Sequence, residues 1–496
     1  MEKNIFRCHF SVIFENTAAF GVFLILVLFG QIQNVIEFTS GMKKEDFWKV
    51  LIGLIVVLVI TIVLFAYQWM VWRKTYIIVE DQAIVVQRLT LNMKENTYGI
   101  KNISNVNLEQ NLFEMVMGTY KIKIDTNSRT TADKTDIKII LAKDKAIEFK
   151  NFVMTQMRGE QKERTQDLRA EDLKAEDYDV KYEIGDLVRH SVFATPLFVI
   201  FCFFGVCILI VIGLAQAKFG NELLDFAKGA LGGYLAIGLA IVGTLGTTVK
   251  NFVKFYDFRV KRFEDRLLIG YGLLKKRNYE IPINMINAIK INQSSLSRIF
   301  KRYSLEIVNI GVGDEKDEGS FLILTSKKEE FERVLCKVLP EFASTTDEQI
   351  RRQPKRVWKL IVFKTVLVTL FGGGFLLGAL KLEVPQSALI PMICGVAAMV
   401  VVTIVSSVFH FRTVGLCIGE DYLGIAQGIF KKITTLIKYD KIQLIEIKQG
   451  PISKKMGLAH GIVFILASIR SSICPFAYIE VDQCDEIVKK MKGKLN

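Results

Sequence analysis

The chain has 496 residues, of which 51% are hydrophobic and 23% are charged, and its formal net charge is +14. This length leaves room for several domains, and the composition fits a chain that alternates membrane-spanning with aqueous segments. Nucleic-acid binding would also use positive charge, but we find no basic helix, zinc-finger spacing or RNA-binding strand motif to support it. Eight cysteines without a C-x-x-C pair favour a reducing environment and argue against a disulfide framework or a zinc site.

Six apolar runs are long enough to cross a bilayer as helices, which takes about 20 residues. They lie, in three close pairs, at residues 17–31, 48–71, 191–214, 226–249, 357–380 and 388–409. The first run follows a basic leader but precedes no small-residue cleavage site, so we interpret it as a membrane span and not as a signal peptide. The sequence therefore predicts a multi-domain membrane protein with six transmembrane α-helices in three pairs.

Lysine and arginine gather on one side of these predicted spans. The loops inside the pairs, at residues 32–47, 215–225 and 381–387, hold few basic residues, whereas the outer flanks are rich in them. Because basic flanks stay in the cytoplasm, we expect both termini and all the large aqueous segments to be cytoplasmic.

Each predicted pair is followed by a strand-rich module, and a series of residues recurs in the three modules in the same order. The dipeptide Glu-Asp recurs before an apolar run, at Glu80, Glu264 and Glu420, and a glutamine follows at Gln110, Gln293 and Gln449. Each copy closes on an amphipathic helical pattern. The series predicts a triplicated unit of short strands closed by one helix, a β-barrel or β-sandwich with a C-terminal helix.

This order predicts eight segments along the chain. They are a first transmembrane pair at 1–72, a first module at 73–157, a charged linker at 158–188, a second pair at 189–252, a second module at 253–342, a linker at 343–355, a third pair at 356–410 and a third module at 411–493. The charged linker alternates acidic with basic residues and has no apolar stripe, so a solvated helix or a disordered tether is expected there.

The sequence offers little apparatus for catalysis. No nucleophile elbow, zinc-protease motif or phosphate-binding loop occurs in a usable context. His9 and His190 each lie just before a predicted span, where a proton or metal site or a simple interfacial cap would fit, and the lack of ligand-spaced partners favours the cap. The repeated glutamines are expected to bond to strands inside each module. We therefore predict no catalytic residue, no cofactor and no metal.

Basic surfaces remain as candidates for binding lipid or a partner. The second module offers Arg262, Arg266, Lys275, Lys276, Arg277, Lys301 and Arg302, the third offers Lys431, Lys432, Lys454 and Lys455, and the first offers a weaker set, Arg88, Lys94 and Lys101. In the third module these charges adjoin apolar residues at Ile429-Phe430 and Ile452, a combination that could press a loop into lipid headgroups. A solvated hairpin face beside a membrane is the alternative interpretation.

Three repeats of two spans plus a strand-rich module, with these motifs in order, resemble the bacterial pleckstrin-homology-like (PH-like) membrane proteins, specifically the large YdbT-like members. The resemblance covers nearly the whole chain. It implies PH-type folds of two packed antiparallel sheets capped by a C-terminal helix, and a location in the bacterial cell membrane. It also implies a small single-module PH-like companion membrane protein and a link to resistance against bacteriocins and other membrane-directed peptides.

The resemblance also suggests where a ligand would bind. Eukaryotic PH domains bind phosphoinositides through basic residues of the first hairpin, and Lys275, Lys276 and Arg277 hold a comparable place here. The first module has no such cluster and bacteria generally lack these lipids, so inositide recognition is not expected.

Together, these features predict a non-enzymatic integral membrane protein whose three PH-like modules bind anionic membrane lipids or a protein partner at the inner leaflet. Its expected role is membrane homeostasis or protection against membrane-active peptides. Two alternatives stay open. A transporter or channel subunit would need ionisable residues inside its helix bundle, and a scaffold for a small companion protein would bind protein without any lipid preference.

Overall fold

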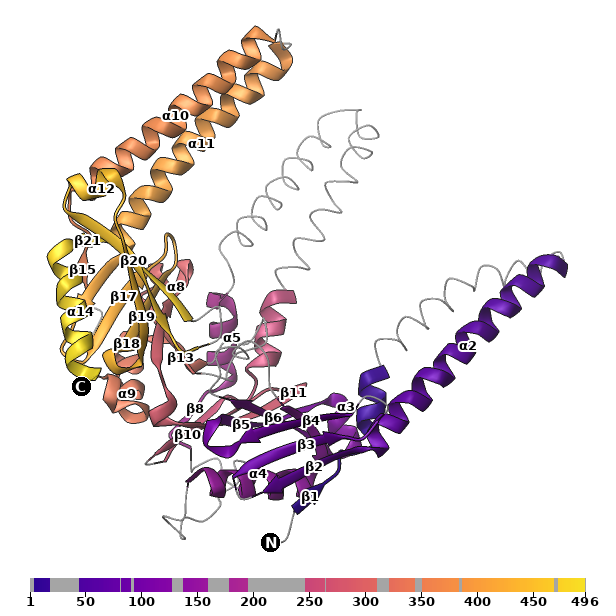
Figure 1. The fold of residues 1–496 in the computed structure, drawn as a ribbon. Coiled ribbons are helices and arrows are strands. Elements are labelled where there is room, and N and C mark those ends of the chain that lie inside the picture. The colour runs from indigo at the N-terminus through magenta and orange to yellow at the C-terminus, as the bar shows by residue number, and fades with distance from the viewer. Residues whose placement is uncertain are drawn as a thin grey trace. The chain divides into compact units, whose positions relative to one another are not determined.

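The computed structural model describes residues 4–17, 44–80, 82–90, 93–126, 137–158, 178–194, 246–263, 265–309, 321–343, 350–382, 386–467 and 472–495. The chain forms two compact units. Unit 1 contains residues 1–131, 135–169 and 275–277, and unit 2 contains residues 132–134, 170–274 and 278–496. The first strand-rich module lies in unit 1, and the third and nearly all of the second lie in unit 2 (Figure 1).

The first module consists of two sets of antiparallel strands and a closing helix. The first set runs in the order β1 (Asn4–Phe6), β2 (Thr75–Glu80), β3 (Ala83–Arg88) and β4 (Lys94–Gly99), and the second consists of β5 (Ile103–Asn111), β6 (Thr119–Thr126) and β7 (Ile137–Ala142). Alternate side chains of a strand point to opposite faces, so Ile77 and Val79 of β2 both reach the core. The closing helix α4 (Lys143–Arg158) buries Phe149 and Val153 in the same core.

The second and third modules repeat this order of elements. The second contains β8 (Val180–Lys181), β9 (Arg259–Arg262), β10 (Arg266–Tyr271) and β11 (Lys275–Pro282), then β12 (Ala288–Gln293), β13 (Arg302–Val308), β14 (Phe321–Lys327) and α9 (Lys328–Val338). The third contains β15 (Arg351–Arg352), β16 (Gly415–Ile418), β17 (Tyr422–Gln427) and β18 (Lys432–Lys438), then β19 (Ile442–Lys448), β20 (Leu458–Ile465), β21 (Ile473–Glu480) and α14 (Val481–Leu495). The predicted triplication of a strand-rich unit closed by a helix is therefore confirmed.

Within unit 2, the second and third modules share one sheet. Strand β12 pairs antiparallel with β18, from Ala288 opposite Ile437 to Gln293 opposite Lys432. The resulting sheet has the strand order β14-β13-β12-β18-β17-β16-β15. The modules are thus joined by backbone hydrogen bonds as well as by the chain that connects them.

Each module also contains a short helix that the sequence did not reveal. These helices are α3 (Leu112–Met117), α8 (Ser295–Ile299) and α12 (Pro451–Lys455), and each lies just after one of the repeated glutamines. The glutamine amides donate to backbone oxygens nine residues further on, at 3.0 Å from Gln110 to Thr119, at 3.2 Å from Gln293 to Arg302 and at 3.3 Å from Gln449 to Leu458. The prediction that the glutamines bond to strands is confirmed, and each bond closes the loop that carries a short helix.

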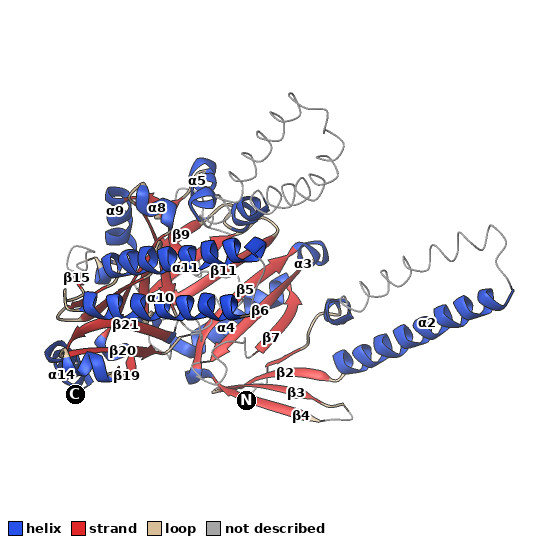
Figure 2. Ribbon diagram, turned by 90° about the horizontal axis from the view of Figure 1, so that it is seen from above, coloured by secondary structure: helices blue, strands red, loops and turns tan. Residues whose placement is uncertain are grey.

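Among the described residues, two helices are long and apolar enough to cross a membrane, namely α10 (Val357–Lys381) and α11 (Gln386–Thr413), the latter over Met392–Thr413. They coincide with the last two predicted spans and lie side by side (Figure 2). A Cβ added to Gly372 of α10 would come within 2.6 Å of Cγ1 of Val396, so this glycine allows the close approach of the two helices.

The remaining predicted spans are described only in part. Helix α2 (Lys44–Arg73) covers the second one. The spans predicted at 17–31, 191–214 and 226–249 lie outside the described residues except at their ends. The arrangement of six helices in three pairs therefore stays a prediction, while the three strand-rich modules and two apolar helices are observed.

Candidate functional site

In every module one hairpin, β3–β4, β10–β11 or β17–β18, turns back onto the segment that leaves a predicted span. The backbone N–H of Leu89 donates to the oxygen of Lys74 at 2.9 Å, just after α2, and the N–H of Leu273 donates to the oxygen of Val253 at 3.1 Å. In the third module, the hydroxyl of Thr413 in the last turn of α11 donates to the oxygen of Ile429 at 3.0 Å. The three hairpin tips therefore lie beside segments that follow three of the predicted spans.

These hairpin tips carry large apolar side chains that are open to solvent. The exposed residues are Leu89 and Met93 in the first module, Leu273 and Leu274 in the second, and Ile429 and Phe430 in the third. The ring of Phe430 also contacts Phe409 of α11, with centroids 5.2 Å apart. Exposed apolar side chains gathered beside a span are typical of a surface that meets a membrane.

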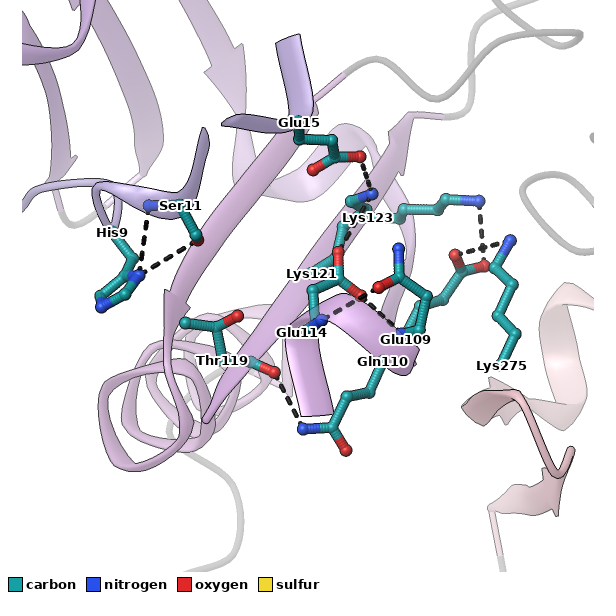
Figure 3. Close-up of polar contacts among 11 residues, drawn as sticks. His9, Ser11, Glu15, Glu109, Gln110, Glu114, Thr119, Lys121, Lys123 and Lys275 are labelled. Carbon is teal, nitrogen blue, oxygen red and sulfur yellow. Dashed lines mark hydrogen bonds and ion pairs between the residues drawn. The ribbon is translucent and has the colours of Figure 1, made fainter. Parts of the chain in front are cut away.

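The short helices form a second contact with the segments that lead into predicted spans. In the first module, Lys121 is paired with Glu114 of α3 and with Glu15, which lies just before the first predicted span (Figure 3). In the second, the hydroxyl of Ser294, which caps α8, donates to the oxygen of Phe193 at 2.5 Å. In the third, Arg356 donates to the oxygen of Met456 at 3.5 Å, just after α12.

The short helices and the residues that follow them are also apolar on the outside. The exposed side chains are Leu112, Phe113 and Val116 at α3, Ile299 and Phe300 at α8, and Ile452 at α12. The side chain of Val116 is 86% exposed. A soluble domain rarely exposes several neighbouring apolar side chains in this way. We call the hairpin tip and the short helix of a module its apolar tips, and every module has both.

A cavity of about 700 Å³ adjoins the apolar tips of the third module. Helices α10 and α11 form one wall, and the third module forms the other. The lining surface is mostly apolar and includes Val357, Leu360, Phe411, Ile429, Ile452 and Phe476, with Lys364 and His410 among its polar residues. Mostly apolar cavities of this size hold small ligands or parts of larger ones.

The basic cluster that was predicted at the hairpin tip of the second module does not lie at that tip. Lys275, Lys276 and Arg277 belong to strand β11, and the tip itself is formed by Leu273 and Leu274. The prediction of a basic tip was therefore wrong. Side chains alternate along a strand, so only Lys276 of the three is exposed, while Arg277 is buried.

Several of the predicted cations in the second module are held in ion pairs. Within unit 1, Lys275 lies 3.1 Å from the buried carboxylate of Glu109 (Figure 3), and Arg277 lies 3.9 Å from it. Arg266 pairs with Glu280 in unit 2. Cations that neutralise buried carboxylates contribute to the fold, because an unpaired buried charge is costly.

Arg262 is paired as well. Its guanidinium lies 2.6 Å from Glu341, and this hydrogen bond holds the pKa of the Glu341 carboxyl below its usual range. Arg302 is half-buried, with its guanidinium 5.2 Å from the ring centre of Phe193. Both arginines therefore have a structural role in the second module.

The other predicted cations are more accessible. Lys301, Lys431, Lys454 and Lys455 are exposed and lie next to the apolar tips, as do Arg88 and Lys94 of the first module, whereas Lys101 is exposed elsewhere and Lys432 is half-buried in β18. Exposed lysines beside exposed apolar side chains are suited to an anionic membrane surface. Binding by these residues stays a prediction.

His9 and His190, the two histidines just before predicted spans, have different environments. His190 in α5 (Ile184–Ala194) is buried between the rings of Phe255 and Phe321, and its Nδ1 lies 2.9 Å from the hydroxyl of Thr325. Burial lowers the pKa of His190 to about 3. It is a core residue and not an interfacial cap, whereas His9 is only half-buried beside Ser11. No group of metal-ligating side chains occurs among the described residues.

Comparison with known proteins agrees with the repeated architecture. The family model for the bacterial PH domain matches residues 23–157, 204–339 and 368–494. The chain is also similar to the UPF0699 transmembrane protein YdbT of Bacillus subtilis (strain 168), with 33% identity over 138 residues. That match covers 27% of this chain and 27% of the relative. No solved structure matches.

Proposed function

Because this chain belongs to the bacterial PH domain family, we propose that it is a non-enzymatic integral membrane protein whose three PH-like modules bind anionic lipid at the inner leaflet. The family and the two apolar helices support a membrane location. The proposal goes further, because it assigns a ligand and an orientation to the modules.

The observation that carries the proposal is the position of the apolar tips. In each module both tips are linked to segments that enter or leave a predicted span by a hydrogen bond or, at α3, by the ion pairs of Lys121 with Glu114 and Glu15. If these spans cross the bilayer, the tips reach the headgroup layer. Fully burying one large apolar side chain contributes roughly 1.5–3 kcal/mol, so partial burial of several such side chains per module would hold the modules against the membrane.

The charges that surround these tips favour anionic lipid as the ligand. The exposed lysines Lys431, Lys454 and Lys455 flank the apolar tips of the third module. Each Lys or Arg near an anionic leaflet contributes about 1 kcal/mol of attraction. The adjoining cavity would accept part of an acyl chain, and Lys364 on its wall would face the phosphate.

The same proposal fixes the orientation of the chain. The basic flanks of the predicted spans favour a multi-pass protein of the bacterial cell membrane with both termini in the cytoplasm. The resemblance to YdbT-like proteins suggests a physiological role in membrane homeostasis or in resistance to membrane-active peptides, together with a small single-module PH-like membrane protein as a partner.

A transporter or channel subunit is the second candidate. It would need ionisable side chains along the interior of the helix bundle. In α10 the charged residues of the predicted span are Lys359 and Lys364, and both lie in its first turns, near the end that joins the third module. This favours lipid contact over a transport pathway.

The proposal can be tested on the purified full chain in a neutral detergent. Phosphatidylglycerol should raise its melting temperature more than the same amount of phosphatidylcholine, and salt should weaken the difference because the lysines are exposed. The double variant Lys454→Gln, Lys455→Gln should lose much of the preference. The matched control, Lys489→Gln with Lys492→Gln on the closing helix α14, should keep it. Equal stabilisation by the two lipids in the unmodified chain would refute selective binding of anionic lipid.

A further inference from the structure

Strands β12 and β19 occupy equivalent places in successive modules. Counting back from the repeated glutamines, Ala288 of β12 corresponds to Leu444 of β19, and Ile291 corresponds to Ile447. Ala288 and Ile291 are 0% and 5% exposed, whereas Leu444 and Ile447 are 50% and 40% exposed. Apolar residues at matching positions are thus covered in the second module and open in the third.

The difference has a direct structural cause. Strand β12 has a neighbour on each side, β13 and β18. Strand β19 pairs with β20 and is an end strand of the sheet β19-β20-β21, with no second neighbour among the described residues. An end strand presents a row of unpaired backbone groups, and proteins usually protect it with charges, proline or a bulge. Here the charged residues are Glu446 and Lys448, which pair with each other.

We propose that the free edge of β19 is a docking site for a β-strand of a further PH-like module, carried by a separate membrane-anchored chain. That strand would add to β19 as β18 adds to β12, with backbone hydrogen bonds along the edge and apolar side chains over Leu444 and Ile447. The inference uses the membrane location of the chain but not lipid binding by its modules.

Strand β18 shows what the docking strand needs. It runs from Lys432 to Lys438 and places Ile437 opposite Ala288 and Thr434 opposite Ile291, the two positions that match Leu444 and Ile447. These β-branched residues favour an extended strand. A suitable partner is therefore a strand of about six residues with β-branched side chains at the two positions that would stand opposite Leu444 and Ile447.

The direction of β19 limits which strands can dock. β19 leads into α12, which contacts the start of α10, so the strand runs toward the spans. An antiparallel neighbour must run away from the spans, as β18 does from its tip beside α11. In two copies held by the same membrane both β19 strands run toward it, so they cannot pair antiparallel with each other.

Strand β4 of a second copy has the required direction, but its side chains are unsuitable. It is an end strand of the sheet β1-β2-β3-β4 and exposes Lys94, Glu95, Asn96 and Thr97. In the register that β18 makes with β12, Lys94 would stand opposite Lys448 of β19. Like charges directly opposite each other destabilise a sheet, so β4 is a protected edge and a separate chain is the better occupant.

The test uses the full chain in nanodiscs made of neutral lipid and a labelled peptide with the sequence of residues 431–439. Saturable binding of the peptide is expected. The double variant Leu444→Lys, Ile447→Lys should weaken it at least tenfold, while Ile473→Lys, an equally exposed site on β21, should leave it unchanged. A peptide that carries Thr434→Pro and Leu436→Pro cannot form the strand and should not bind.

Three results would overturn the proposal. They are no binding of the peptide to the unmodified chain, equal binding to the double variant, or an equal loss in the Ile473→Lys control. Self-association of the chain in nanodiscs that disappears in the Leu444→Lys, Ile447→Lys variant would assign the edge to a second copy and also overturn it. Because the nanodiscs are neutral, failure of lipid binding would leave the peptide result intact.

Discussion

The second and third modules are alike at the end that faces the spans and different at their side edges. Both modules expose apolar tips beside the ends of helices, at Leu273 and Phe300 in one and at Phe430 and Ile452 in the other. Their equivalent strands differ, since β12 is covered by β18 while β19 ends a sheet. Exposed apolar tips are therefore a property of every module, whereas contact between modules depends on a module's place in the chain.

The test of this difference with the largest expected effect compares Ile291→Ala with Ile447→Ala. The first removes a buried side chain from the shared sheet and should destabilise the protein by about 2–4 kcal/mol, whereas the second removes a half-exposed one and should cost under about 1 kcal/mol. The free energy of unfolding of the full chain in detergent would be measured by denaturant titration. Equal losses for the two variants would mean that β19 is covered as β12 is.

The second test uses acid to weaken the second module selectively. The pKa of His190 is lowered to about 3 in the fold, so its neutral form is favoured and the stability it contributes is complete above the ordinary histidine pKa. Below that value the unfolded chain takes up a proton that the folded chain does not, and stability falls by about 2 kcal/mol between pH 7 and pH 5. Thermal unfolding across this range should show the decline.

The variant His190→Gln provides the control for the acid test. Glutamine keeps an acceptor for the backbone N–H of Thr325, which bonds to His190 at 3.2 Å, but does not titrate in this range. The loss of stability between pH 7 and pH 5 should be smaller by about 2 kcal/mol than in the unmodified chain. An unchanged slope would show that other groups cause the acid sensitivity.

The third test concerns the glutamines that close the short-helix loops. Gln293 is buried and Gln449 is exposed. Gln293→Ala leaves the backbone oxygen of Arg302 without its partner and should lower the free energy of unfolding by about 1–2 kcal/mol. Gln449→Ala should lower it by only about 0.3 kcal/mol, because water replaces the lost hydrogen bond. Hydrogen exchange in α8 and α12 would report the local effect, with faster exchange in α8 expected for the first variant alone. Equal acceleration in both helices would go against the difference in burial.

The smallest expected effect is at a loop position that differs between the modules. Lys301 has a φ of +50°, where the first and third modules have Gly118 and Gly457 at +65° and +68°. Glycine adopts this conformation without the steric cost that a lysine bears. Lys301→Gly should therefore raise the melting temperature slightly, by the equivalent of up to about 1 kcal/mol, and Gly457→Lys should lower it. A destabilised Lys301→Gly variant would show that the lysine side chain itself matters for stability.

The sequence was sufficient for the repeated part of the fold. Repetition of Glu-Asp, an apolar run and a glutamine predicted three strand-rich modules, and the amphipathic stripe predicted α9, because these patterns reflect local geometry. The same patterns predicted that the glutamines bond to strands. The exposed apolar residues Ile429, Phe430 and Ile452 of the third module were found in this way as well.

The candidate site was predicted less well, and the reason is that burial depends on distant strands. Arg277 looks like an exposed basic residue in the sequence, yet it is buried near Glu109, which lies far away along the chain. Ile291 and Ile447 have similar sequence neighbours, and the exposure of each is decided by whether another strand lies beside it. The apolar tips of the first two modules were missed because two or three apolar residues in a loop form no periodic pattern.

The most direct test of the central claim is the depth of the hairpin tip of the third module in a lipid bilayer. A spin label would be placed at Phe430→Cys or, as an aqueous reference on the same module, at Ile447→Cys, in a full chain whose eight native cysteines are replaced. Oxygen and a water-soluble nickel complex would then compete to relax the label. We predict that the label at residue 430 is accessible to oxygen and shielded from nickel, and that the label at residue 447 is accessible to nickel. Equal access of nickel to both positions would contradict membrane contact by the apolar tips.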